Sequence, residues 1–122
     1  MADTNLSILV VTDSPHVRAE LEFGVPADME ASFARDSREA MKAMADKTPS
    51  AVVVDLQTGS AGGYGLARDM EADERLARVP IAILLERDQD AWLAHQAGAR
   101  LFRTKPVEAV RLFSDLRDLV SD

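Results

Sequence analysis

Three charged residues stand where predicted β-strands end, and their side chains are those that phosphoryl transfer needs. Asp13 and Asp55 each close an apolar run, and Lys105 follows a shorter one. Two carboxylates at one place repel each other unless a cation lies between them, and oxygen ligands of this kind suit Mg²⁺. A carboxylate can also act as a nucleophile, and a lysine ammonium stabilises a transferred phosphoryl group. Together the three residues predict a phosphoryl-transfer site.

Each of these residues also has an ordinary structural interpretation. An aspartate after a strand often caps the next helix, and a loop lysine is usually solvated. Taken singly, Asp13 and Lys105 each have about even odds of a functional or a structural role. For Asp55 alone, a helix cap is favoured by about two to one. The fold decides between them, because it determines whether the three residues meet.

The elements that would position these residues alternate between strand and helix. The run 51–54, AVVV, is typical of a central parallel strand that is covered on both faces. With this one, the predicted strands lie near residues 6–12, 29–34, 51–55, 81–85 and 100–103. Short apolar strands that alternate with helices predict an α/β fold, a doubly wound five-stranded parallel sheet with helices on both faces.

The strand order brings the candidate residues together. Order 2-1-3-4-5 is the common arrangement for five such units with right-handed crossovers. The first and third strands are then neighbours, about 4.8 Å apart, which places Asp13 beside Asp55 at the carboxyl edge of the sheet. Lys105 reaches the same edge from the end of the fifth strand. In the first helix, Val17, Leu21 and Phe23 are predicted to form the apolar side.

The composition limits the function classes. A length of 122 residues indicates one domain, and no output domain is expected because the chain ends after its last predicted helix. The net charge of −7 argues against direct binding to nucleic acid. The chain has no cysteine, which excludes disulfides and is compatible with the cytoplasm. No apolar run is long enough for membrane insertion, so we expect a cytoplasmic protein.

Six stretches of the chain, in this order and at this spacing, resemble the response-regulator receiver family over nearly the whole length. They are ILVVTDSP (8–15), VDL (54–56), GYGLAR (63–68), VPIAIL (79–84), QAGA (96–99) and TKP (104–106). The resemblance implies a flavodoxin-like receiver fold and a role in phosphorelay signalling. The implied partner is a histidine kinase or a phosphotransfer protein.

The resemblance also implies a role for individual residues. Asp55 is the implied phospho-acceptor, Lys105 contacts the phosphoryl group, and Phe102 takes the place of the aromatic switch residue. Asp13 and Asp55 are the implied side-chain ligands of Mg²⁺, with the backbone carbonyl of Gln57. The Lys105–Pro106 bond is implied to be cis. For Phe102, plain core packing is an equally good interpretation.

The chain departs from the family at several positions, among them Thr12, Leu85 and Glu86. Receivers usually have two acids at the end of the first strand, and here the first is Thr12, so we expect Mg²⁺ to bind weakly. A hydroxyl residue usually ends the fourth strand, and a small residue follows it. Here these two positions are Leu85 and Glu86. Leu85 cannot donate a hydrogen bond to a phosphoryl oxygen, and Glu86 adds bulk and charge where those oxygens would approach.

Two classes of function follow. The first is a stand-alone receiver with an atypical switch, which is no enzyme beyond self-catalysed transfer of a phosphoryl group to Asp55. The alternative is a pseudo-receiver that binds partner proteins independently of phosphate. In both, we expect a downstream protein to bind the face formed by the helix near 88–97, the strand near 100–103 and the last helix. Trp92, if exposed, would anchor that partner. A small flavodoxin-like enzyme is a distant third class.

Overall fold

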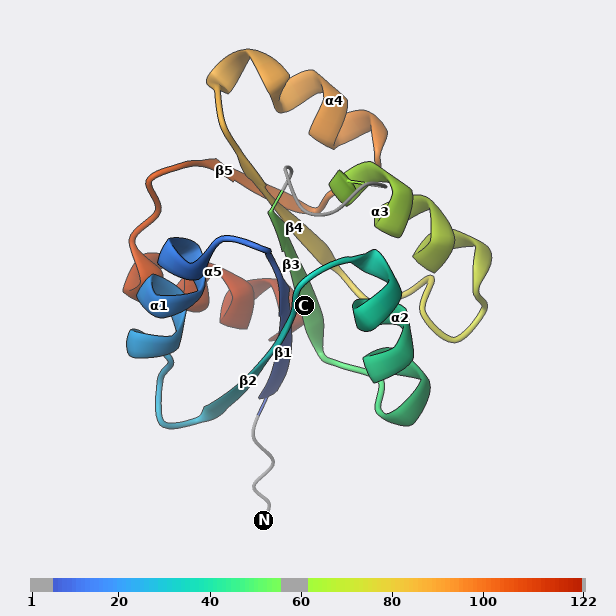
Figure 1. Ribbon diagram of the computed structural model, residues 1–122, viewed down its shortest axis with the longest axis horizontal. Helices are drawn as coiled ribbons and strands as arrows, with labels where there is room; N and C mark the ends of the chain where they lie inside the picture. Colours follow the sequence, from blue (N-terminus) through green and yellow to red (C-terminus); the bar gives the residue numbers. More distant parts are fainter. Residues whose placement is uncertain (1–5, 56–61, 122) are drawn as a thin grey trace.

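The computed structural model describes residues 6–55 and 62–121, and it contains one parallel sheet with helices on both faces (Figure 1). The five strands occur in the order β2-β1-β3-β4-β5, as predicted. Their bounds are β1 Leu6–Val11, β2 Met29–Ala34, β3 Ala51–Asp55, β4 Ile81–Leu85 and β5 Leu101–Thr104. The helices are α1 Pro15–Phe23, α2 Ser37–Asp46, α3 Gly62–Ala72, α4 Ala91–Gln96 and α5 Ala109–Ser121, with a short 3₁₀ turn η1 at Asp88–Asp90.

Two apolar cores lie on the two faces of the sheet. Figure 1 shows α1 and α5 on one side of the strands, and α2 and α3 on the other, with α4 above. Along β3 the side chains alternate between these cores, because successive residues of a strand point to opposite faces. Val53 belongs to the core under α1 and α5, and Val54 to the core under α2, α3 and α4. Both faces of β3 are therefore buried, which explains its unbroken apolar run.

The predicted apolar side of α1 is correct for Leu21, which is buried, and wrong for Phe23. The Phe23 side chain is 95% exposed. In a helix two residues apart differ by about 200° around the axis, so a residue two positions after the buried Leu21 faces away from the sheet. The N-terminus of α1 is as its sequence indicates, since the Ser14 hydroxyl accepts a hydrogen bond from the Val17 amide at 3.2 Å.

The register between β1 and β3 determines which residues meet at the carboxyl edge. Val11 is aligned with Val54. One step further, Thr12 stands opposite Asp55, and Asp13 follows one residue beyond. On the other side of β3, Asp55 is aligned with Leu84 of β4. The sheet thus delivers a threonine to Asp55 from its neighbour β1.

Candidate functional site

Asp55 is a buried carboxylate at the carboxyl end of the central strand. Its side chain is 2% exposed, and both of its oxygens have partners. The Lys105 ammonium donates a hydrogen bond to Oδ1 at 2.7 Å, and the Thr12 hydroxyl donates one to Oδ2 at 2.8 Å. A buried charge needs such partners, because the interior solvates it poorly. The aspartate is therefore held in one orientation, with its oxygens at the edge of the sheet.

Lys105 reaches Asp55 from the loop after β5. Its backbone amide donates a hydrogen bond to the carbonyl of Leu85 at 2.8 Å, which continues the pairing of β4 with β5 by one residue. The Lys105–Pro106 bond is cis, as predicted. The ammonium also forms an ion pair with Glu86. Burial lowers the pKa of Lys105, but the hydrogen bonds and charges of Asp55 and Glu86 outweigh it and raise the pKa above its ordinary value.

Asp13 lies at the same edge of the sheet and is exposed. With Asp55 it offers two carboxylates. Hard oxygen donors of this kind fit Mg²⁺. Within residues 6–55 and 62–121, no cluster of three acids or histidines could hold a metal ion. With the neutral Thr12 beside Asp55, the two carboxylates fit a site with little negative charge. Gln57, whose carbonyl was the third expected ligand, lies outside the described residues.

The two residues considered for a switch have different environments. Leu85 is fully buried and belongs to the core under α2, α3 and α4. Phe102 of β5 is 37% exposed, so plain core packing does not describe it. It is aligned with Ile83 of β4, which belongs to the same core as Leu85. Both residues are thus associated with the α4 side of the sheet.

The geometry fits chemistry on an anionic group that attaches to Asp55. A carboxylate oxygen is a nucleophile, and the ammonium beside it can neutralise charge on the group being transferred. Comparison with known families agrees with this arrangement, because the model of the response regulator receiver domain matches residues 8–117. The chain belongs to the response regulator receiver domain family.

Named relatives of this receiver domain are regulatory proteins. It is 29% identical to response regulator PleD of Caulobacter vibrioides over 115 residues, which cover 92% of this chain and 25% of PleD. It is 28% identical to the transcriptional regulatory protein PrrA of Mycobacterium tuberculosis over 120 residues, 96% of this chain and 51% of PrrA. The chain therefore spans between a quarter and about half of the length of these relatives.

Solved receiver structures share the fold. A putative response regulator from Chloroflexus aurantiacus superposes with a TM-score of 0.90 at 24% identity, over 98% of this chain and all of the other. The receiver domain of a sensor histidine kinase from Pseudomonas aeruginosa, which holds a magnesium ion in its active site cleft, gives 0.87 at 23% identity, with 98% and 100% covered. In the described part of this receiver, no helix has the length and apolarity needed to cross a membrane.

Two contacts of the receiver site were not predicted. The sequence identified Thr12 as a missing acid but not as the hydrogen-bond donor to Asp55. The predicted strand bounds carried the signal for that bond, since Thr12 and Asp55 ended neighbouring strands. Glu86 was predicted to bring charge near the phosphoryl group, but its ion pair with Lys105 was not foreseen. Such a pair depends on side-chain reach, which strand register alone does not give.

Proposed function

We propose that this receiver domain accepts a phosphoryl group on Asp55 from the phosphohistidine of a histidine kinase or a phosphotransfer protein. The observation that carries the proposal is the 2.7 Å hydrogen bond from the Lys105 ammonium to Oδ1 of the buried Asp55. A nucleophile and a positive charge are held together at the end of the central strand, where α/β sheets bind their ligands. By its chemistry the domain transfers a phosphoryl group to itself and is no enzyme acting on other substrates.

The transfer would proceed at one carboxylate oxygen of Asp55. That oxygen attacks phosphorus, the new P–O bond forms, and the P–N bond of phosphohistidine breaks. The leaving imidazole nitrogen keeps the electron pair and takes up a proton. Lys105 stays near the acceptor and stabilises the phosphoryl oxygens through its charge. Thr12 holds Oδ2 at 2.8 Å, which fixes the carboxylate plane during the attack.

Asp13 and Asp55 are the side chains that would hold Mg²⁺ in this reaction. Bound magnesium would supply positive charge that neutralises the phosphoryl oxygens. Thr12 provides a neutral oxygen where a further carboxylate would raise the affinity, so the proposed site is weak.

The proposal is tested by incubating the protein with a small-molecule phosphodonor and Mg²⁺ and measuring its intact mass. Wild type is expected to gain one phosphoryl group. Asp55→Asn, which preserves the shape of the side chain but is a poor nucleophile, is expected to gain none. A wild-type chain that stays unmodified with a donor that modifies another receiver in the same solution would contradict the proposal.

A pseudo-receiver is the second candidate, and the environment of Leu85 favours it. Leu85 is fully buried in the core and has no group that could follow a phosphoryl oxygen. In this alternative the domain binds its partners equally well with and without a modification at Asp55. The intact-mass experiment separates the two candidates, because a pseudo-receiver works without a phosphoryl group on Asp55.

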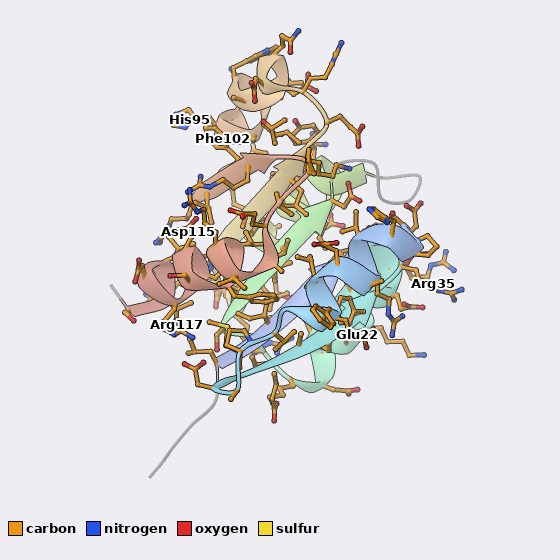
Figure 2. The ribbon with its side chains drawn as sticks, turned by 90° about the vertical axis from the view of Figure 1, so that its left-hand side faces the viewer. Glu22, Arg35, His95, Phe102, Asp115 and Arg117 are labelled. Carbon is orange, nitrogen blue, oxygen red and sulfur yellow. The ribbon has the colours of Figure 1, made fainter. Side chains whose placement is uncertain are left out.

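In both cases the α4–β5–α5 face is the proposed site for a downstream protein. Trp92 is 60% exposed on α4, and Phe102 lies on the adjacent strand. Figure 2 shows that His95 of α4, Phe102 of β5 and Asp115 of α5 lie along one side of the molecule. An exposed tryptophan is a typical anchor for a protein partner. The acidic chain is proposed to act in the cytoplasm without direct nucleic-acid contact.

A further inference from the structure

Glu86 is held beside Lys105 by the way in which β4 and β5 end. Leu85 is the last residue of β4, and its carbonyl accepts the hydrogen bond from the Lys105 amide at 2.8 Å. Glu86 follows directly, so its backbone starts next to the lysine. Glu86 and Lys105 both line a cleft of about 330 Å³ between α1 and the loop after β5. Glu86 is thus placed to meet the ammonium from the cleft side.

The Lys105 ammonium lies between two carboxylates. It donates to Oδ1 of Asp55 at 2.7 Å and forms the ion pair with Oε2 of Glu86. The Asp55 carboxylate is buried, whereas the Glu86 side chain is 45% exposed. The contact with Glu86 is therefore the one that can be exchanged, because water can solvate the released carboxylate.

We infer that Glu86 is a built-in competitor that slows phosphorylation of Asp55 by holding the ammonium that the phosphoryl group needs. This inference rests on the proposed function. An incoming phosphoryl group carries negative charge, and it gains most from Lys105 when no other anion is bound there. While Glu86 is in place, the group meets both an occupied lysine and a carboxylate of like charge. Phosphorylation then requires Glu86 to turn out toward solvent.

The first experiment measures the rate of phosphorylation with a small-molecule phosphodonor and Mg²⁺ by intact mass. Glu86→Gln keeps the size of the side chain and removes its charge, and Glu86→Ala removes both. Each is expected to raise the rate constant at least tenfold over wild type. Glu108→Gln is the matched control, because this acid lies on the loop after β5 that carries Lys105, is 81% exposed and pairs with Arg111 rather than Lys105. Its rate is expected to stay within about twofold of wild type, since exposed pairs contribute little.

The second experiment does not depend on phosphorylation. Asp55→Asn and the double variant Asp55→Asn/Glu86→Gln are titrated with inorganic phosphate, and binding is followed by the NMR resonances of the Lys105 side chain. The competitor model predicts at least tenfold tighter phosphate binding in the double variant. A role of Glu86 in folding alone would leave this ratio near one.

The outcomes separate this inference from the proposed function. If wild type and both Glu86 variants are never modified, the proposed function is wrong, and tighter phosphate binding in the double variant would then support only competition between Glu86 and an anion for Lys105, not a brake on phosphorylation. If wild type is modified and removal of the Glu86 charge changes neither the rate nor the phosphate affinity by more than twofold, the competitor is overturned. A gain in Glu86→Ala that is absent in Glu86→Gln would also overturn it, because size and not charge would then be responsible.

Discussion

Thr12 places a neutral side chain beside Asp55, where receivers usually have an acid. It is buried, aligned with Asp55 by the β1–β3 register, and donates to Oδ2 at 2.8 Å. Its hydroxyl also accepts a hydrogen bond from the Ser14 amide at 3.1 Å. A neutral side chain here satisfies the buried carboxylate without a metal ion. A carboxylate in its place would bring two buried negative charges into contact, and these would need a cation.

Thr12→Asp is therefore expected to strengthen Mg²⁺ binding about tenfold, or about 1.4 kcal/mol, and to lower the melting temperature when Mg²⁺ is absent. Calorimetric titration and thermal unfolding measure the two effects. Asp13→Ala should abolish the binding that wild type has. Thr12→Val removes the hydroxyl without adding charge, so tighter Mg²⁺ binding in that variant as well would show that the acid is not responsible.

Helices α1 and α5 approach each other so closely that a larger side chain is not tolerated where they meet. Gly24 ends α1, and a Cβ placed on it would lie 2.4 Å from the Cβ of Ala109 at the start of α5. The two backbone segments can approach this closely only because Gly24 lacks a side chain. Helix α1 also lines the cleft that Glu86 lines, so the packing of α1 against α5 positions one wall of that cleft.

Gly24→Ala is expected to lower the free energy of unfolding by about 1–3 kcal/mol, as other overpacked cores do. Chemical denaturation measures the change. Adding Ala109→Gly should recover part of the loss, since the clashing carbon is then gone. If the double variant instead loses more unfolding free energy than the two single variants lose together, the clash is not the cause.

At the scale of elements, the sequence predicted the positions and the order of the strands. All five strands were predicted within about one residue, and β1, β3 and β4 owe this to their buried apolar runs, whereas β2 is buried only at its ends and β5 has no buried residue. The strand order was predicted because right-handed crossovers leave few choices. Phe23 was misplaced because an aromatic near a helix end was counted with the apolar side regardless of its angle. The Glu86–Lys105 pair was missed because it depends on side-chain conformation and loop path, which no periodicity encodes.

For the whole molecule, one exposed ion pair links the last helix to the start of β2. Arg117 of α5, labelled in Figure 2, donates two hydrogen bonds to Asp28, at 3.0 and 2.7 Å. Residues 89 positions apart are joined in this way. The hydrogen bonds from Arg117 hold the pKa of Asp28 below its ordinary value of 3.8, although the small desolvation of the carboxylate opposes them.

This lowered pKa predicts a pH dependence of stability. A carboxylate with a lowered pKa in the folded state stabilises the fold fully above its ordinary pKa, and the effect is lost as pH falls through the folded pKa. The stability difference between wild type and Asp28→Asn should thus be constant from about pH 7 to about pH 5 and shrink below 3.8. Urea denaturation over this range measures it. A difference that widens on acidification would rule out this pair as the source, and added salt should reduce the difference because the pair is exposed.

Coupling between Asp55 and the α4–β5–α5 face is the remaining property of the whole molecule. Modification of Asp55 can shift this face only if the two states of the face interact differently with the phosphoryl group. Leu85, the residue between them, is buried in the α4-side core and has no donor to move. We therefore expect Phe102 to keep one side-chain rotamer and Trp92 to bind its partner constitutively. Leu85→Thr supplies the missing hydroxyl and is the variant in which coupling should emerge.

The measurement is the affinity of a downstream partner for wild type, Asp55→Ala and Leu85→Thr, each with and without phosphodonor. Wild type and Asp55→Ala should bind equally in both conditions, whereas Leu85→Thr should show the larger response to the donor. A donor-dependent change of tenfold or more, about 1.4 kcal/mol, in wild type but not in Asp55→Ala would mean that phosphorylation reaches the face without a hydroxyl at position 85. The path would then run through another contact of the phosphoryl group, and Lys105 would be the first to examine, because its ammonium pairs with both Asp55 and Glu86.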